Sequence, residues 1–279
     1  MITLDAKTDY SFMRGFGKPA QWLARADELG ASVLGVADYC STWGHVPFRD
    51  ALKKSNVRLL YGVQLPVVLV LEKDPRHALV TVIAKNNEGL KALYALVTTA
   101  HKQKYYRPRV TWKQVRELHG LCEVIVNDAS ISDLPAIRTV EGAYIAARPR
   151  NDAMLHFVRD SGLPVVATTA PTYPAVSERE GFELVQAISN NHRIGEVAAG
   201  TQHWLRGTEY VSAMKAIGLE VDPEWIMNLT DIAMGCMADM PTATPIILEG
   251  DLEQLAREGA VEKGIDLSAD AYSSRLARE

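Results

Sequence analysis

The sequence lacks the features of secreted, membrane-spanning or strongly basic proteins. It has only three cysteines in 279 residues, widely spaced and without a C-x-x-C pair, which excludes a disulfide scaffold or structural zinc site and favours a reducing cytoplasm. The longest apolar run, residues 65–71, contains Pro66 and is far too short to span a membrane. A strand-like pattern begins by Ile2, so no signal peptide is visible. The net charge is −4, so any contact with nucleic acid must be local.

What the chain does contain is an alternation of short apolar runs and amphipathic segments. Runs such as Val57–Val63 and Val67–Leu71, on either side of a proline, are typical of strands, and helix-like segments follow many such runs. Repeated β-then-α units predict a mostly parallel sheet, often a barrel, with functional residues on the loops after the strands. From about Phe182 the pattern is purely helical. We therefore predict a β/α barrel over residues 1–200 and a helical extension or connector over residues 201–279.

The C-terminal residues are expected to form a short helix. Residues 269–279 are helix-like, with an incomplete apolar stripe at Ala271, Leu276 and Ala277. A helix of about 11 residues is marginal without packing. We expect either the cut end of a longer protein, whose next segment orders this helix, or a frayed terminus.

Five segments, in order along the chain, carry a family resemblance. The first is similar to the metal-binding opening His-x-His-Thr-acid-Tyr-Ser-x-x-Asp-Gly, because Thr8-Asp9-Tyr10-Ser11 and Gly15 match its scaffold. Together the five resemble the PHP (polymerase and histidinol phosphatase) domain at the N-terminus of bacterial DNA polymerase III alpha subunits. The matching segments are residues 3–15, 36–40, 60–64, 77–90 and 162–168.

This resemblance implies an α/β fold, a distorted TIM-like β/α barrel of PHP type with a C-terminal helical extension. It also implies a role in DNA replication beside the palm and thumb of a polymerase, and a docking surface for a proofreading exonuclease or a clamp-associated partner. Ser11 to Gly15 is similar to error-prone alpha subunits, whereas Trp43-Gly44-His45-Val46 is more similar to phage-encoded ones. Replicative, error-prone and phage types therefore remain open.

Most of the family's metal ligands have been replaced. The resemblance places the family's ligands, one position at a time, on residues of other types, and only His77 clearly keeps the family's residue type. The positions of this degenerate metal site, with the neighbouring Asp38, are Asp5, Lys7, Arg14, Asp38, Tyr39, Gln64, His77, Ala170 and Thr172.

Charge argues against a metal ion at these positions. Lys7 and Arg14 bring two positive charges against Asp5 and Asp38, so the cluster is about neutral without metal. A dication about 4 Å from one ammonium would be repelled by roughly 8 kcal/mol at an effective dielectric constant of 20. We expect a pocket without metal or other cofactor, in which Lys7 and Arg14 pair with Asp5, Asp9 or Asp38. The alternative is that these charges are merely solvated on the surface.

The second candidate site is a basic segment with interleaved aromatic residues, residues 101–113. Its composition is typical of contacts to a nucleic-acid backbone with base stacking. A solvated loop, and a docking surface for the polymerase body or a partner, are the alternatives. Its candidate contact residues are Lys102, Lys104, Tyr105, Tyr106, Arg107 and Arg109.

The function predicted from these observations is a catalytically inactive, structural PHP domain of a DNA polymerase III alpha subunit. It would be cytoplasmic, contact DNA only indirectly and have no membrane contact. One alternative is a metal-dependent phosphoesterase or 3′–5′ exonuclease with a degenerate ligand set. Another is a stand-alone adaptor protein.

Overall fold

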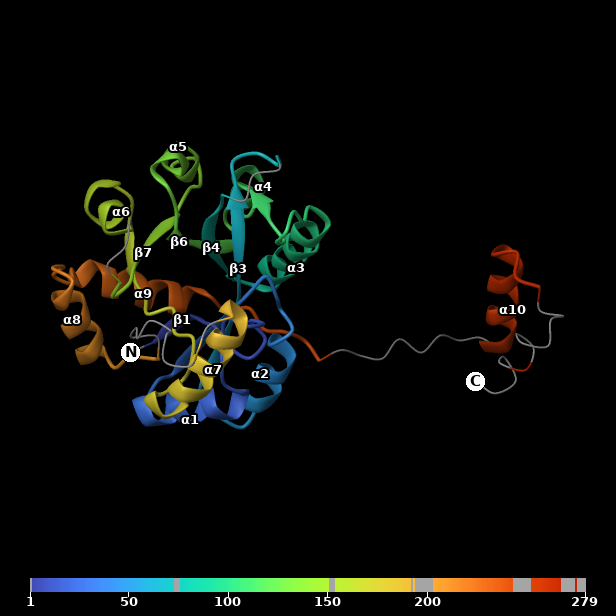
Figure 1. Ribbon diagram of the computed structural model, residues 1–279, viewed down its shortest axis with the longest axis horizontal. Helices are drawn as coiled ribbons and strands as arrows, with labels where there is room; N and C mark the ends of the chain where they lie inside the picture. Colours follow the sequence, from blue (N-terminus) through green and yellow to red (C-terminus); the bar gives the residue numbers. More distant parts are fainter. Residues whose placement is uncertain are drawn as a thin grey trace. The chain divides into compact units, whose positions relative to one another are not determined.

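A curled mixed sheet lies at the centre of residues 1–240, as Figure 1 shows. The computed structural model describes residues 2–72, 76–150, 154–191, 193, 203–242, 252–266 and 274. Neighbouring strands follow the order β1-β2-β3-β4-β6-β7-β8, and β5 pairs with β3. Among the strands of the described residues, only β4 runs antiparallel to its neighbours, β3 and β6. The strands are β1 (Thr3–Ala6), β2 (Val33–Tyr39), β3 (Arg58–Val68), β4 (Ala78–Ala84), β5 (Val110–Thr111), β6 (Cys122–Asp128), β7 (Tyr144–Ala147) and β8 (Val165–Ala167).

Helices connect and cover these strands, so the predicted α/β fold of distorted TIM-like barrel type is confirmed. Local signals set their ends: Pro19 occupies the first turn of α1, Gly30 ends it in the left-handed region, and the Asn86 side chain caps α3. Within the described residues, no helix is long and apolar enough to cross a bilayer. The helices are α1 (Pro19–Leu29), α2 (His45–Leu52), α3 (Asn87–Lys102), α4 (Trp112–Arg116), α5 (Leu134–Ile137), α6 (Met154–Asp160), α7 (Arg179–Asn190), α8 (Gly207–Ala216), α9 (Pro223–Gly235) and α10 (Leu252–Glu262).

Pro66 does not interrupt a strand, contrary to the two separate strands expected around it. β3 continues through Pro66, which lies opposite Leu79 of β4. On the other side of β3 the pairing with β2 ends at Gln64, and the pairing with β5 begins only at Val67. Pro66 therefore occupies a short edge position, where its missing N–H removes no bond to a neighbouring strand.

Backbone hydrogen bonds between loops join the two ends of the sheet order. The Lys7 N–H donates to the Pro171 carbonyl at 2.8 Å, and the Phe16 N–H donates to the Thr172 carbonyl at 2.8 Å. The segment after β8 is thereby held against the segment after β1. This contact fixes the backbone at the end of the sheet where the predicted site lies.

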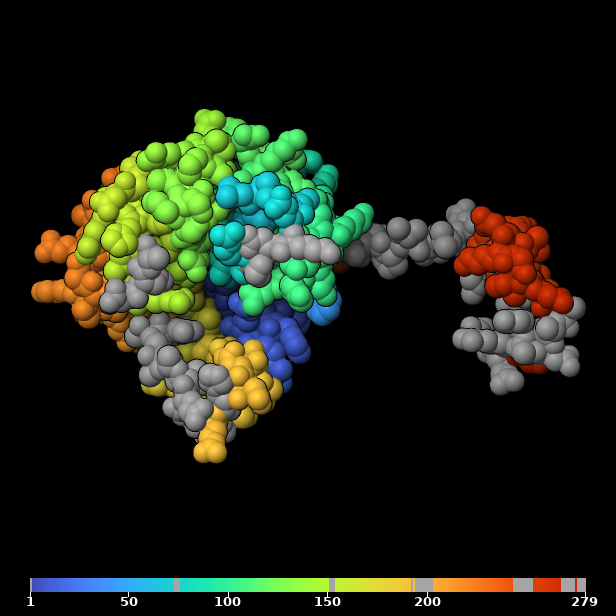
Figure 2. All heavy atoms as spheres, turned by 45° about the horizontal axis from the view of Figure 1, so that its top comes forward, coloured from blue at the N-terminus to red at the C-terminus, as the bar shows by residue number. Residues whose placement is uncertain are grey.

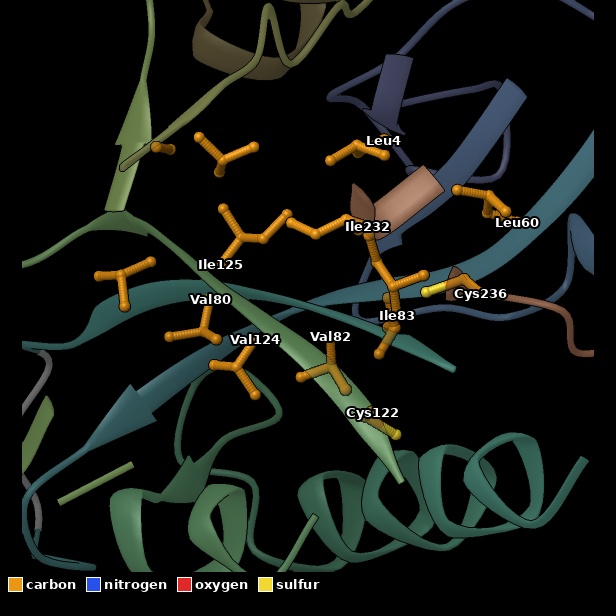
Figure 3. Close-up of a cluster of buried hydrophobic side chains, with 14 of the residues drawn as sticks. Leu4, Leu60, Val80, Val82, Ile83, Cys122, Val124, Ile125, Ile232 and Cys236 are labelled. Atoms are coloured by element: carbon orange, nitrogen blue, oxygen red, sulfur yellow. The ribbon is translucent and has the colours of Figure 1, made fainter. Parts of the chain in front are cut away.

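The chain divides into two compact units, residues 1–240 and 241–279. The first unit includes α8 and α9, because Tyr210 donates to the Ala147 carbonyl at 2.9 Å and Asn228 donates to the Val165 carbonyl at 2.8 Å. Figure 3 shows Ile232 of α9 in one apolar cluster with side chains of the strands. The predicted division at residue 200 therefore differs from the compact units, and stays a prediction about functional parts. The helix expected over residues 269–279 lies outside the described residues except for residue 274.

Arg58 ties the end of α9 to the sheet, and its loss is expected to lower stability. Its guanidinium donates to the carbonyls of Ala233 and Cys236 at 2.6 and 2.5 Å, groups that a helix end leaves without intrahelical partners. Arg58→Met should lower the free energy of unfolding by about 2 kcal/mol, the usual worth of hydrogen bonds to a charged donor. Urea denaturation measures the change. The matched control is Arg206→Ala, which removes an exposed ion pair with Glu28 and should cost less than about 1 kcal/mol. Equal effects of the two variants would contradict the assignment.

Candidate functional site

The carboxyl ends of the parallel strands meet at one edge of the sheet, the barrel mouth, which we define by Lys7, Asp38, Tyr39, Gln64 and Arg148. Lys7 follows β1, Asp38 and Tyr39 end β2, and Arg148 follows β7. Gln64 lies within β3, and its Cα is paired with that of Tyr39. Residues far apart in the sequence are thus brought to one place because parallel strands end together.

Three further predicted positions lie around this edge. His77 precedes β4, which runs antiparallel to β3, so the start of β4 comes to the end of β3 at Val67. Ala170 and Thr172 lie in the segment after β8, and Ala170 has a positive φ of 42°. Ala170 offers no side-chain donor or acceptor, so it cannot replace the metal ligand that the resemblance places there.

Asp38 is fully buried and surrounded by hydrogen-bond donors. Its Oδ1 accepts from the Thr8 N–H at 2.7 Å and from the Ser11 hydroxyl at 2.6 Å, and the Thr8 hydroxyl lies 3.0 Å from both oxygens. Burial raises the pKa of Asp38, although these donors and the Lys7 charge oppose the rise. The scaffold residues of the opening segment therefore hold this carboxyl group in place of a cation.

Asp5, also fully buried, belongs to a chain of polar side chains across the sheet. Its Oδ1 accepts from the Thr168 hydroxyl at 2.5 Å, and its Oδ2 accepts from the Asn127 amide at 3.2 Å. The Thr81 hydroxyl donates to the Asn127 amide oxygen at 2.7 Å. Hydrogen bonds between side chains thus link four strands or strand ends, and each oxygen of Asp5 accepts one of these bonds.

Lys7 does not form the expected ion pair. Its side chain is 5% exposed, and its ammonium donates to the Asp5 backbone carbonyl at 2.8 Å. Among the described residues it makes no salt bridge with a carboxylate. Burial lowers the pKa of Lys7, the Asp5 and Asp38 charges oppose that change, and Arg148 adds to it. The ammonium therefore balances two buried acids at longer range while a carbonyl satisfies its hydrogen bond.

Arg14 also differs from the expectation. Its guanidinium carbon lies 4.0 Å from the centre of the Tyr39 ring, a cation–π arrangement, and it forms no ion pair within the described part of the chain. Burial raises the pKa of Tyr39, an effect that the nearby guanidinium groups of Arg14 and Arg107 oppose. Both positions are replaced ligands of the resembled site, so here two former ligand positions stack on each other.

The groups at the barrel mouth do not fit a metal site. Among the described residues, no three or more His, Cys, Asp or Glu side chains are arranged to hold a metal ion. The oxygens of Asp5 and Asp38 accept hydrogen bonds from protein donors, and Lys7 supplies a fixed charge that repels cations. The arrangement neutralises buried acids, but it offers no group of free ligands to a divalent ion.

Sequence reasoning missed Asn127, Thr168, Thr81 and Arg148. Asn127 is fully buried, and its backbone carbonyl accepts a hydrogen bond from Arg148. The available signal was weak: each of these residues is a single polar side chain in or directly after an apolar run. A polar residue is also found where a strand simply reaches solvent.

The basic segment predicted as a contact site lies beside the end of β2. His101 is hydrogen-bonded to the Cys40 carbonyl at 2.9 Å, and Lys102 and Lys104 are exposed. Arg109 is 7% exposed, and its guanidinium carbon lies 5.0 Å from the centre of the Tyr105 ring. The two candidate sites found in the sequence are therefore neighbours.

Known proteins are similar to this chain over most of its length. A family model described as "PHP domain" matches residues 4–165. The DNA polymerase III subunit alpha of Streptococcus pyogenes serotype M1 is 23% identical over 284 residues, which cover 99% of this chain and 26% of that protein. The error-prone DNA polymerase of Anaeromyxobacter sp. (strain K) is 34% identical over 98 residues, covering 35% of this chain and 8% of that protein. The chain thus spans about a quarter of the length of the S. pyogenes relative.

One solved structure matches most of this chain and nearly all of its own. A protein from Bifidobacterium adolescentis, assigned as a metal-dependent phosphoesterase, superposes with a TM-score of 0.48 and 11% sequence identity. The match covers 80% of this chain and 97% of that one.

Proposed function

Because the chain belongs to the PHP domain family, whose model matches residues 4–165, we propose that it is a catalytically silent, structural PHP domain of a DNA polymerase III alpha subunit. The relation to these subunits extends over nearly the whole chain at low identity. The proposed lack of catalytic activity is inferred from the geometry of the barrel mouth.

The observation that carries the proposal is the buried Lys7 ammonium bonded to the Asp5 carbonyl. It lies where the resembled site would need a histidine that binds cations. Metal-assisted hydrolysis requires ligands that fix the ion and leave a position for water. Asp38, the second buried acid near Lys7, already accepts hydrogen bonds from the Thr8 N–H and the Ser11 hydroxyl.

The partners belong to the same proposal. The domain would support the palm and thumb of a polymerase and dock a proofreading exonuclease, with DNA contacted only indirectly, in the cytoplasm. Residues 1–200 would act as the barrel and residues 201–279 as the connector. Replicative, error-prone and phage-type subunits all fit, and a stand-alone adaptor differs from them by having no polymerase body. The nucleotide sequence beyond codon 279, read for palm carboxylates, separates the adaptor from the subunit.

The chain is expected to bind no stoichiometric zinc or manganese and to hydrolyse no phosphodiester. The reason is the repulsion from Lys7 together with the lost ligands. Metal content after dialysis is measured by plasma mass spectrometry, and hydrolysis with bis-p-nitrophenyl phosphate and with single-stranded DNA.

One outcome would overturn this proposal in favour of the phosphoesterase or exonuclease. It is metal-dependent hydrolysis that Lys7→Ala abolishes and that Lys53→Ala leaves intact. Lys53 is the control because its side chain is 54% exposed and pairs with Asp50 on the surface.

A further inference from the structure

A cavity of about 470 Å³ lies beside the barrel mouth. This volume is within the range of small-ligand sites, about 300–1,000 Å³. Pro66 and Val68 of β3 give it an apolar side, and His77, Tyr105, Tyr106, Arg107 and Arg109 supply rings and cations. Among the described residues no acidic side chain lines it, although the chain as a whole carries a net charge of −4. The cavity therefore favours a ligand with both an anionic group and a flat apolar one.

Tyr106 is held out at the tip of a tight turn. The backbone groups of Tyr105 and Arg107 hydrogen-bond to each other across it at 3.2 and 2.6 Å. Tyr106 has a φ of +56°, a left-handed conformation that is unfavourable for a residue with a side chain. Its ring is 79% exposed and meets the Tyr105 ring edge-on at 4.6 Å. The turn thus presents an aromatic face to solvent on a locally fixed backbone.

Two guanidinium groups approach Tyr39 next to this turn. Arg14 lies over the ring, and Arg107 is close enough to the hydroxyl to affect its ionisation. The Tyr39 hydroxyl oxygen is buried and has no hydrogen-bond partner among the described residues. Neither arginine forms an ion pair with a carboxylate of the described chain. Two guanidinium groups beside one ring are suited to an oxyanion, because guanidinium forks match phosphate oxygens.

Neighbouring loops complete the surface. The Cys40 thiol lies 3.9 Å from the Pro108 carbonyl, which places the loop after β2 against the basic segment. Phe12 and Trp43, on the loops after β1 and β2, are 82% and 81% exposed. In Figure 2, cyan atoms from the end of β3 and the segment after it lie among green atoms from the middle of the chain on this face. Exposed aromatic rings beside cations are the composition of surfaces that bind single-stranded nucleic acid.

We propose that this cavity and the adjoining Arg14–Tyr39–Arg107 cluster form a metal-independent site for single-stranded nucleic acid. Arg107 and Arg14 hold a backbone phosphate, and Tyr106 stacks on a base. The site goes beyond the structural role proposed above and does not depend on it, because it needs neither a metal ion nor a polymerase body.

The test is fluorescence anisotropy of the full chain with a short labelled oligothymidylate, in the presence of EDTA. Arg107→Gln should weaken binding by about tenfold, as expected for the loss of a charge-assisted hydrogen bond. Tyr106→Ala should weaken it at least fivefold, since stacking on one base is worth about a factor of 5–150. The control is Lys91→Ala, which removes an equal charge from an exposed pair with Glu88 on α3 and should change the affinity less than twofold. Both tested side chains are exposed, so the variants should fold, and thermal melting verifies this.

Other results would overturn the proposal. Absence of binding, or equal affinity of all variants, would show that the surface is only a solvated loop. An abasic oligonucleotide that binds as tightly as oligothymidylate would show a phosphate-only anion site, without base stacking. Equally tight binding of polyglutamate would favour an acidic peptide partner. The two proposals fail separately: metal-dependent hydrolysis contradicts the catalytic inactivity proposed above, whereas only the binding results just named overturn this site.

Discussion

Replacing Lys7 with methionine is expected to lower the free energy of unfolding by about 3 kcal/mol near neutral pH. Methionine fills a similar volume, but it removes the positive charge that faces the buried acids Asp5 and Asp38. Removing one partner of a buried charge group costs about 3–5 kcal/mol, because the remaining charge is left uncompensated. The lower figure applies here, since Lys7 bonds directly to a carbonyl and acts on the carboxylates at longer range.

A second variant separates this effect from simple loss of packing. Asp38→Asn removes one of the two acids while keeping an oxygen that accepts from Thr8 and Ser11. The double variant Lys7→Met, Asp38→Asn should recover most of the lost stability, because buried ion groups can be replaced together at little cost. Equilibrium urea unfolding of the two single variants and the double variant gives the coupling between the positions.

The pH dependence of the stability lost in Lys7→Met gives an independent check. Burial already raises the pKa of Asp38, and removal of Lys7 should raise it further. The folded state then binds a proton more readily than the unfolded chain, so acidification should reduce the penalty of Lys7→Met. A penalty that stays constant from neutral to acid pH, with no rescue by Asp38→Asn, would show that Lys7 acts only by packing.

Some positions of this site are predictable from the sequence, and their hydrogen-bond partners are not. Asp5, Asp38 and Gln64 were expected near one edge because the carboxyl ends of parallel strands meet there, and the strand register brings them together. The partners of Lys7 and Arg14 were not predictable in this way. Sequence gives the balance of charge, but whether an ammonium reaches a carboxylate or a carbonyl depends on distances of an ångström or two.

Long-range polar partners are the second part that sequence could not give. Asp5 bonds Asn127 and Thr168, which are 122 and 163 residues away along the chain. Their meeting depends on how strongly the sheet curls, which no local pattern encodes. For the same reason, the helical pattern of α8 and α9 is the same whether they pack on this barrel or on another body, so it could not set the boundary of the compact unit.

A buried histidine outside the barrel mouth should make the protein sensitive to acid. His45, at the start of α2, is 1% exposed, and its ring nitrogens lie 2.9 Å from the Gly62 carbonyl and 3.1 Å from the Tyr94 hydroxyl. Burial lowers its pKa from 6.5 to about 4. The unfolded chain therefore binds this proton more readily than the folded protein, and acidification favours unfolding.

The expected loss is about 3 kcal/mol between pH 6.5 and pH 4, the span between the two pKa values, since one unit corresponds to about 1.4 kcal/mol. Stability from this group is complete above pH 6.5 and falls as the pH decreases. His45→Gln keeps a donor for the Gly62 carbonyl but cannot take up the proton, so its stability should change less over this range. The surrounding Tyr61 and Tyr94 have raised pKa values and do not titrate there. Acid-sensitive carboxyl groups and His203 contribute equally to both proteins, so the difference between the two pH profiles belongs to His45. Parallel profiles, measured by urea unfolding, would show that the ring is protonated in the folded state without cost.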